Sequence, residues 1–182
     1  MEFLFEGNTV NLRRIRISDS RSIQKHADNR EIAIYLYLPS PYTIRDARAW
    51  IRRTNRLISK KKAYHLGIED RKSGEIIGMI GLRKVNLEDK NAEVGYWLGK
   101  EYRGKGYTKE ALNLILKFAF NDLKLARVYA VVHARNIASY RLLEKSGFRR
   151  EGTWRKASFL GRRWNDVYSY GILKGEFKGG PR

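Results

Sequence analysis

Cysteine is absent from this chain of 182 residues. Its absence excludes a disulfide scaffold, a cysteine-ligated zinc site and a cysteine nucleophile, and it favours a reducing compartment. Long apolar runs are also missing, so we expect no segment that crosses a membrane. The first residues, MEFL, lack the basic and apolar regions of a signal peptide. We therefore expect a soluble protein of the cytoplasm.

Acidic residues are few relative to basic ones. The chain has 38 Lys and Arg against 19 Asp and Glu, which gives a net charge of +19 at pH 7. A surface of this kind attracts polyanions such as nucleic acid, ribosomes, anionic cofactors or acidic proteins. The hydrophobic content of 42% excludes an intrinsically disordered chain. A chain of this length can bury a sizeable core as a single domain.

The pattern of apolar and polar residues predicts an α+β chain whose single sheet is mostly antiparallel. We expect strands at residues 8–15, 63–69, 75–85, 92–98, 125–133, 148–160 and 166–173. We expect helices at 18–29, 44–60, 108–122 and 136–146, and a loop with aromatic residues at 35–41. No linker interrupts the chain, so residues 1–173 are expected to form one domain and residues 174–182 a frayed tail.

The predicted helix after Thr43 has one apolar face and one cationic face. Thr43 and Asp46 have the spacing of a capping box. The apolar face consists of Ile44, Ala47, Trp50, Ile51, Leu57 and Ile58, and the cationic face of Arg45, Arg48, Arg52, Arg56 and Lys60. Solvation is the ordinary explanation for a charged face. The alternative is a docking surface for an acidic protein, a ribosomal surface or tRNA.

A glycine-rich loop separates the predicted strand at 92–98 from the helix that follows. Its glycines allow a tight turn and the close approach of a ligand, and its N–H groups, Arg103 and Lys105 favour an anion. A Walker A loop is excluded because Gly106 stands where a hydroxyl should bind magnesium. A dinucleotide fingerprint is excluded because Lys109 replaces its third glycine. A cradle for the pyrophosphate of coenzyme A is the third candidate.

Four motifs resemble those of the GNAT superfamily of N-acetyltransferases, in its RimJ/RimL-like branch, which acetylates protein N-termini. They are the loop RGKGYT at 103–108 with the preceding strand AEVGYWL, the segment NIAS at 136–139, the segment LEKSGF at 143–148, and DVYSY at 166–170. The similarity extends from about residue 10 to residue 173. It implies the GNAT fold, a single mixed, mostly antiparallel sheet with a splayed central strand pair and flanking helices.

The resemblance implies that acetyl-CoA is the cosubstrate and that a primary amine receives its acetyl group. The acceptor most directly implied is a protein N-terminal α-amine of the ribosomal-protein type. Direct attack in a ternary complex is expected, because there is no cysteine and no Gly-x-Ser-x-Gly elbow for an acyl-enzyme. By resemblance, the residues that bind the cosubstrate are Tyr96, Trp97, Leu98, Arg103, Gly104, Lys105, Gly106, Tyr107, Thr108, Asn136 and Ser139.

Two residues are candidates for the catalytic proton transfers. Many relatives carry a tyrosine general acid seven residues after this Asn136, but Leu143 occupies that position here. Ser139 is then the candidate that hydrogen-bonds the leaving sulfur, with helix capping as its alternative role. Glu93 is the candidate base, directly or through a water, with an ordinary exposed strand carboxylate as the alternative. The three histidines show no metal-ligand spacing, so we predict no metal.

Two alternatives to the N-terminal acceptor stay open at the level of sequence. A polyamine or another small amine keeps the chemistry, although a net charge of +19 mildly disfavours a polycation. A non-catalytic module that binds RNA or the ribosome on the same fold is the alternative of another class. The sequence also leaves the oligomeric state open, with a homodimer among the options.

Overall fold

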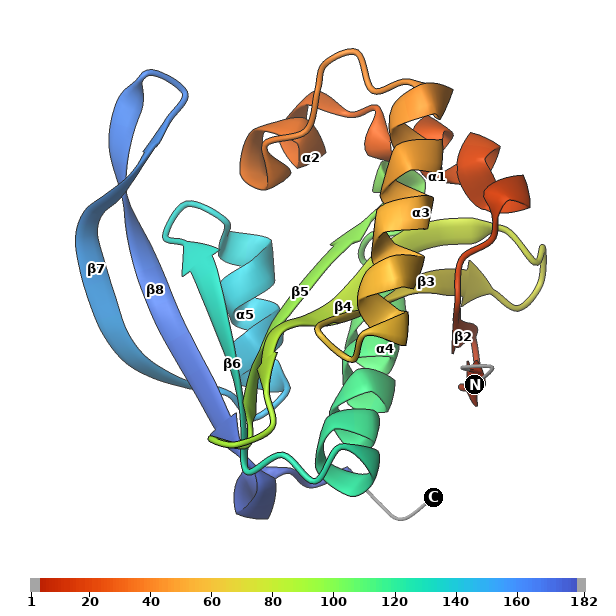
Figure 1. Cartoon of the computed structure of the whole chain (residues 1–182). Helices are drawn as coiled ribbons and strands as arrows, with labels where there is room; N and C mark the ends of the chain where they lie inside the picture. Colours follow the sequence, from red (N-terminus) through yellow and green to blue (C-terminus); the bar gives the residue numbers. More distant parts are fainter. Residues whose placement is uncertain (1–3, 180–182) are drawn as a thin grey trace.

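The computed structural model describes residues 4–179 and shows one eight-stranded sheet in the order β1-β2-β3-β4-β5-β6-β8-β7 (Figure 1). The strands are β1 (Leu4–Glu6), β2 (Val10–Arg13), β3 (Tyr64–Asp70), β4 (Ile76–Asn86), β5 (Asn91–Leu98), β6 (Arg127–His133), β7 (Arg149–Leu160) and β8 (Arg163–Leu173). Every neighbouring pair is antiparallel except β5 and β6. The predicted α+β class and mostly antiparallel sheet are confirmed.

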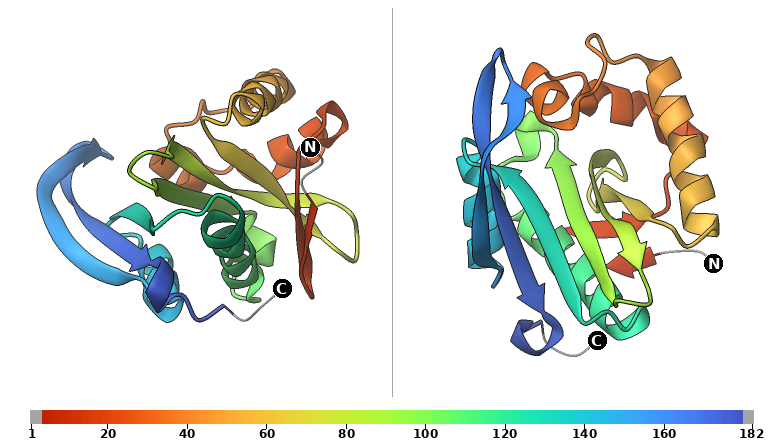
Figure 2. Two further views of the ribbon diagram at one scale, coloured as in Figure 1. Left: turned by 60° about the horizontal axis from the view of Figure 1, so that its bottom comes forward. Right: turned by 60° about the vertical axis from the view of Figure 1, so that its left-hand side comes forward.

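Helices cover both faces of this sheet (Figure 2). One face carries α1 (Ser20–Ala27), α2 (Arg30–Leu36) and α3 (Ile44–Ser59), and the other carries α4 (Tyr107–Lys117) and α5 (Ile137–Lys145). The larger core lies under α4 and α5, and a smaller one joins α1 and α3 to the opposite face. Amphipathic helices on both sides explain why the central strands are apolar on both faces.

The central strands β5 and β6 separate along their length. They pair only over three residues, where Asn91 lies opposite Arg127 and Glu93 opposite Tyr129. Beyond Glu93 the two strands diverge, which is visible in Figure 1 as a gap that widens toward α2. The divergence confirms the splayed central pair that the family resemblance implied. It leaves the β6-facing backbone groups of β5 without a neighbouring strand, which is where an extended ligand can bind.

Helix α2 was not predicted, and it occupies part of the segment expected as a loop. The side chain of Asn29 caps it by accepting from the N–H groups of Glu31 and Ile32. The helix ends at Tyr37, which takes a left-handed conformation with φ 53°. The expected loop at 35–41 therefore begins only after Leu36. Proline cannot continue a helix, so Pro39 and Pro41 obscured the preceding helical turns.

The C-terminal segment is docked, in contrast to the frayed tail expected from residue 174. A 3-10 turn spans Lys174–Glu176, and the N–H of Lys174 donates to the carbonyl of Ala126 at 2.9 Å. The ring of Phe177 packs on Phe120 at 5.4 Å between centroids. These contacts hold residues 174–177 against the domain, and residues 180–182 lie outside the described residues.

Candidate active site

The glycine-rich loop leads from β5 through a 3-10 turn at Lys100–Tyr102 to the start of α4 at Tyr107. Gly104 and Gly106 have φ values of 77° and 86°, a region that other residues rarely adopt. A Cβ built on either glycine would meet no protein atom within 4 Å, so the space above the loop is open. The first N–H groups of α4, from Tyr107 and Thr108, have no intrahelical partner. The loop therefore fits an anionic group such as a pyrophosphate.

The two cations of the loop are held differently. Arg103 places Nη1 2.6 Å from Glu31 Oε2 of α2, and its Nε donates to the carbonyl of Leu98 at 3.3 Å. The hydrogen bond from Arg103 lowers the pKa of Glu31. Lys105 stacks loosely on Tyr102, with Nζ 5.8 Å from the ring centroid. Arg103 thus ties the loop to α2, whereas Lys105 lines the groove beside α4.

That groove is a broad cavity of about 1230 Å³ between α4, α5 and the C-terminal segment. Its cationic lining residues are Lys105, Lys109, Lys117, Lys145, Arg149 and Lys178. Four acids also line it, namely Glu6, Glu110, Glu144 and Glu176. Glu110 accepts a hydrogen bond from Thr9, Glu144 accepts one from Tyr170, and Glu176 pairs with Arg149 at 3.1 Å. The surplus of positive charge suits the phosphates of a nucleotide-containing ligand.

Only part of the β5 backbone faces the gap. The N–H of Gly99 donates to Ile77 of β4 at 2.8 Å, and backbone groups alternate in direction along a strand. Tyr96 and Leu98 therefore direct their backbone groups toward the gap, while Trp97 directs its own toward β4. A Cβ on Gly78 of β4 would lie 2.5 Å from the carbonyl oxygen of Trp97, which agrees with this direction.

Ser139 and Asn136 lie together at the start of α5. The side chain of Asn136 caps the helix by accepting from the N–H of Ser139 at 3.2 Å. The hydroxyl oxygen of Ser139 is 2.9 Å from that of Tyr96, which also lies 3.2 Å from the Ser139 carbonyl oxygen. Burial raises the pKa of Tyr96 to about 12, although the hydrogen bond with Ser139 opposes this shift. Leu143, at the position of the family's tyrosine acid, is buried in the core.

Glu93 lies at the narrow end of the gap, opposite Tyr129 in the last pair of β5 with β6. Its side chain is only 2% exposed, so the alternative of an exposed strand carboxylate is wrong. Its Oε1 is 2.5 Å from Arg83 and its Oε2 is 3.1 Å from Lys84. Glu93 and Trp97 are four residues apart on β5, so their side chains point to the same face of the sheet. Trp97 packs on the side of α1 and α3. Glu93 therefore lies on the opposite face of β5 from Tyr96 and Ser139.

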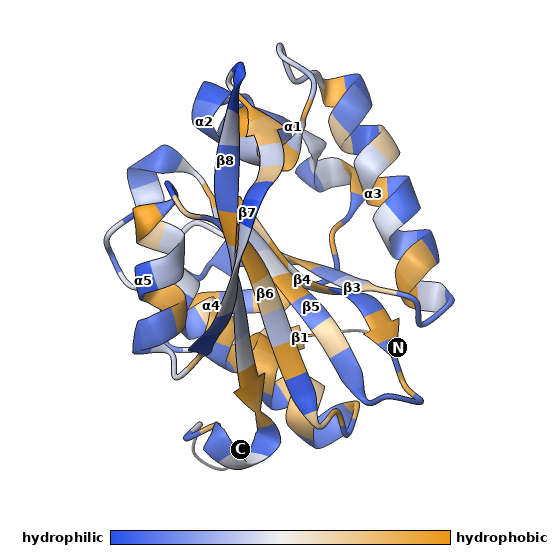
Figure 3. Ribbon diagram, turned by 90° about the vertical axis from the view of Figure 1, so that its left-hand side faces the viewer, coloured by the Kyte–Doolittle hydropathy of each residue, from blue (hydrophilic) through white to orange (hydrophobic). Residues whose placement is uncertain are grey.

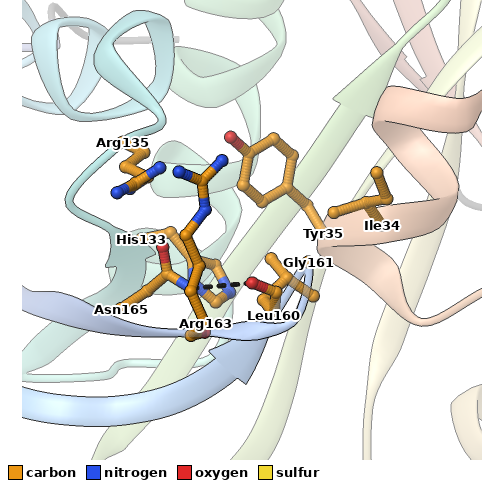
Figure 4. A pocket seen from close by; sticks show the side chains of 8 residues that line it. All are labelled: Ile34, Tyr35, His133, Arg135, Leu160, Gly161, Arg163 and Asn165. Atoms are coloured by element: carbon orange, nitrogen blue, oxygen red, sulfur yellow. Dashed lines mark hydrogen bonds between the residues drawn. The ribbon is translucent and has the colours of Figure 1, made fainter.

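A second pocket at the wide end of the gap was missed by the sequence analysis (Figure 4). It measures about 180 Å³ and brings together Tyr35 of α2, His133 at the end of β6, Arg135 and Arg163. The rings of Tyr35 and His133 are 5.4 Å apart, and burial lowers the pKa of His133. These residues are far apart in the chain, so no local signal could have grouped them.

The fold and the site together define the class of protein. The family described as Acetyltransferase (GNAT) domain matches residues 9–149, and the chain belongs to this family. It is therefore an acyltransferase whose cosubstrate is acetyl-CoA. The expected activity class and cosubstrate are thus confirmed, and the alternative of a non-catalytic module is set aside.

Particular relatives agree with this assignment. The chain is 31% identical to the uncharacterized N-acetyltransferase p20 of Bacillus licheniformis over 180 residues, which covers 98% of this chain and 100% of p20. It is 27% identical over 171 residues to the spermidine N(1)-acetyltransferase of Vibrio cholerae, covering 94% and 96% of the two chains. The structure of RimL, a ribosomal L7/L12 α-N-protein acetyltransferase in complex with coenzyme A, superposes with a TM-score of 0.87. That alignment covers 94% and 98% of the two chains at 19% identity, so it shows a shared fold.

Residues 4–179 lack two kinds of feature. None of the helices in this range is both long enough and apolar enough to span a membrane. The same range holds no group of three or more His, Asp or Glu side chains that could hold a metal ion.

Proposed function

We propose that the acceptor is the α-amine of a protein N-terminus and that the acetyl group moves to it by direct attack in a ternary complex. The observation that carries this proposal is the charge of the pocket at the wide end of the gap. Its lining includes Arg135 and Arg163 and contains no acidic residue. A polyamine needs carboxylates as partners, so this pocket and the net charge of +19 would repel it. A peptide N-terminus carries no such excess of positive charge.

The two cavities support a ternary complex. The groove beside α4 and the pocket at the wide end of the gap share no lining residue. Two ligands can therefore occupy them together, which direct transfer requires. Bound acetyl-CoA would supply a thioester whose carbonyl carbon is the electrophile. It would be held by the loop from Arg103 to Thr108 and by the backbone groups of Tyr96 and Leu98, which flank Trp97. Asn136 and Ser139 would complete the site.

Ser139 is the proposed proton donor to the leaving sulfur. Its hydroxyl contacts that of Tyr96, whose pKa of about 12 keeps the phenol protonated at neutral pH. When Ser139 gives its proton to the sulfur, its oxygen can take up the proton of the Tyr96 phenol, which then regains a proton from water. The cap of α5 needs only the N–H of Ser139, so its hydroxyl is available for this role.

Glu93 is the proposed proton acceptor for the amine, through a chain of waters that leads from the acceptor pocket at the wide end of the gap to the narrow end. It lies on the α1 and α3 face of β5, whereas Ser139 lies on the other face, so the two groups would serve opposite ends of the reaction. Its carboxylate pairs with Arg83 and Lys84. A weak base suffices, because an α-amine has a pKa of about 7.7–8.0 and is partly neutral at pH 7.

We further propose that the cationic face of α3 attracts an acidic acceptor or its ribosomal surroundings. This α3 stripe consists of Arg45, Arg48, Arg52, Arg56 and Lys60, all of them exposed. Ala47, Ile51 and Ile58 fix the opposite face of the helix in the core. Within residues 4–179 none of the five cations forms an ion pair, so their charge is available to a partner.

Mass spectrometry after incubation with acetyl-CoA tests the acceptor class. The substrates would be peptides with a free N-terminus, the same peptides with a blocked N-terminus and an internal lysine, and spermidine. We expect acetylation of the free α-amine alone. Acetylation of spermidine with no reaction at any peptide α-amine would contradict the proposal.

A further inference from the structure

Two arginines at the wide end of the gap lack an acidic partner. Arg135 lies in the loop between β6 and α5, and Arg163 is the first residue of β8. Figure 4 shows both guanidinium groups directed into the same space, beside the ring of Tyr35. None of the eight residues that line this pocket is acidic. Within residues 4–179 neither arginine forms an ion pair.

Several other arginines of the chain do have acidic partners. Arg13 pairs with Asp19, Arg103 with Glu31, and Arg127 with Glu151. Two like charges that share a small cavity repel each other until an anion lies between them. A guanidinium group presents parallel N–H donors that match the two oxygens of a carboxylate. The pair is therefore suited to bind a carboxylate from outside the chain.

The backbone that carries Arg163 is fixed, whereas the side chains of Arg163 and Arg135 are exposed. Asn165 donates from Nδ2 to the carbonyls of Leu160 and Arg163, at 3.1 and 2.8 Å, which fixes the backbone at the hairpin turn. The tip of this hairpin is hydrophilic in Figure 3. Burial lowers the pKa of His133, so its ring is neutral at pH 7 and adds no positive charge to that of the two arginines.

The pocket adjoins the proposed catalytic serine. The carbonyl of His133 accepts from the N–H of Asn136 at 2.8 Å, and the side chain of Asn136 accepts from the N–H of Ser139. These two bonds join the pocket wall to the start of α5. Its volume of about 180 Å³ is below the roughly 300–1,000 Å³ of a site for a drug-sized ligand, and it has room for one acidic side chain.

We infer that Arg135 and Arg163 select an acceptor that carries a carboxylate close to its reacting amine. This inference rests on the proposed function, in which the acceptor is a protein N-terminus. The carboxylate then belongs to an Asp or Glu side chain among the first residues of that protein. The two arginines bind it and so direct the α-amine toward Ser139.

A pair of matched peptides tests this specificity on the intact protein with acetyl-CoA. One peptide has Ser at its N-terminus followed by two acidic residues, and its partner has the corresponding amides. We expect kcat/KM for the acidic peptide to exceed that for the amide peptide by at least about tenfold, as expected for charge-assisted hydrogen bonds. Equal values of kcat/KM for the two peptides would overturn the inference.

Two variants assign the preference to the arginines. In the double variant R135Q/R163Q, kcat/KM for the acidic peptide should fall to the level of the amide peptide. Arg155→Gln removes an exposed charge of the same hairpin that does not line the pocket, and it should keep the preference. A preference that survives in the double variant would overturn the role of Arg135 and Arg163.

Calorimetry separates this inference from the proposed function. In the presence of coenzyme A, the wild-type protein should bind the acidic peptide at least about tenfold more tightly than the amide peptide. The double variant should bind the acidic peptide at least about tenfold more weakly than the wild type does. This result would support the inference even if no peptide were acetylated, and equal binding would contradict it. If free aspartate or glutamate were acetylated, and R135Q/R163Q abolished that reaction, the arginine site would stand and the N-terminal acceptor would fail.

Discussion

At Gly104 and Gly106 the need for glycine comes from the backbone as well as from the ligand. Both residues have positive φ angles, and the space where a Cβ would project is open. A side chain there costs about 1–2 kcal/mol in conformation and enters the space that the pyrophosphate needs. We expect Gly104→Val and Gly106→Val each to raise the KM for acetyl-CoA at least about tenfold.

Gly74 supplies the matched control for this prediction. It has φ 71° and equally open surroundings, but it lies in the turn between β3 and β4. Gly74→Val should therefore carry the same backbone cost and leave the KM for acetyl-CoA unchanged. Steady-state kinetics with a melting curve for each variant make the comparison. A folded G104V/G106V double variant with normal affinity would show that the loop does not bind the cosubstrate.

Ser139→Ala tests the proposed proton donor without removing the helix cap, because the cap uses the backbone N–H of this residue. We expect kcat to fall on the order of 10–100-fold, with little change in the melting temperature. Tyr96→Phe keeps the buried ring and removes the hydroxyl 2.9 Å from Ser139, so it should lower kcat by a smaller factor. Asn136→Ala removes the cap and should cost about 1 kcal/mol of stability. Wild-type kcat in S139A would leave the hydroxyl without a catalytic role.

Glu93→Gln separates a base from a structural ion pair through the pH dependence of kcat. A base matters most where the amine is protonated, so the loss should be largest at low pH and should shrink toward pH 9. We expect a loss on the order of 10–100-fold at pH 6. A loss of kcat that is constant from pH 6 to pH 9, together with a lower melting temperature, would show that Glu93 is a structural ion-pair partner of Arg83 and Lys84 and not a base.

At the scale of single elements, local patterns predicted most of the helices and every strand except β1, the short strand at Leu4–Glu6. The buried faces of β6 and α3 produce a periodic pattern of apolar residues, and this pattern can be recognised from residues that are close together in the chain. The capping box of Thr43 and Asp46 is present as predicted. Helix α2 has only seven residues, and two prolines follow it, so its local signal was weak. Ile44, expected on the apolar face of α3, is 38% exposed because it lies at the first turn.

Contacts between distant elements explain what the sequence could not predict. The tail is held by Phe177 on Phe120 and by Lys174 on Ala126, and neither contact leaves a local signature. The pocket at the wide end of the gap joins Tyr35 to Arg163 through the packing of α2 against the hairpin, where the hydroxyl groups of Tyr37 and Ser158 are 3.1 Å apart. The glycine-rich loop could be proposed as an anion site from sequence alone, because its glycines and cations are adjacent in the chain.

The α3 stripe gives a prediction at the scale of one helix. Single exposed ion pairs are worth less than about 1 kcal/mol, but the summed field of five cations acts on the rate of encounter. Reversal of Arg48, Arg52 and Arg56 to Glu should lower kcat/KM for an acidic protein acceptor by about tenfold at low salt. The loss should diminish at physiological salt, where the screening length is about 8 Å. The KM for acetyl-CoA should hardly change.

A second triple reversal controls for net charge. Lys72, Lys90 and Lys124 are exposed and lie away from α3, so their reversal changes the total charge equally. This control should retain most of the kcat/KM for the acidic acceptor. If the stripe variant and the wild type had equal kcat/KM for the acidic acceptor at low ionic strength, the α3 stripe would be a solvated face without a partner.

At the scale of the whole molecule, the proposed function divides the reaction between two cavities. The groove beside α4 carries cations that suit phosphates, and we propose that the pocket near α2 and the hairpin receives the acceptor. Between them the diverging strands β5 and β6 place Ser139 and Glu93 on opposite faces of β5. The net charge of +19 acts over the whole surface and favours anionic partners for both cavities.

A competition reaction tests the identity of the acceptor most directly. The protein would be given limiting acetyl-CoA with equal concentrations of spermidine and of an acidic peptide that has a free α-amine and an internal lysine. Fragment mass spectrometry would then locate the acetyl group. The account predicts that nearly all of it is on the α-nitrogen of the peptide. Acetyl groups on spermidine or on the lysine side chain, with the α-amine left free, would contradict the account.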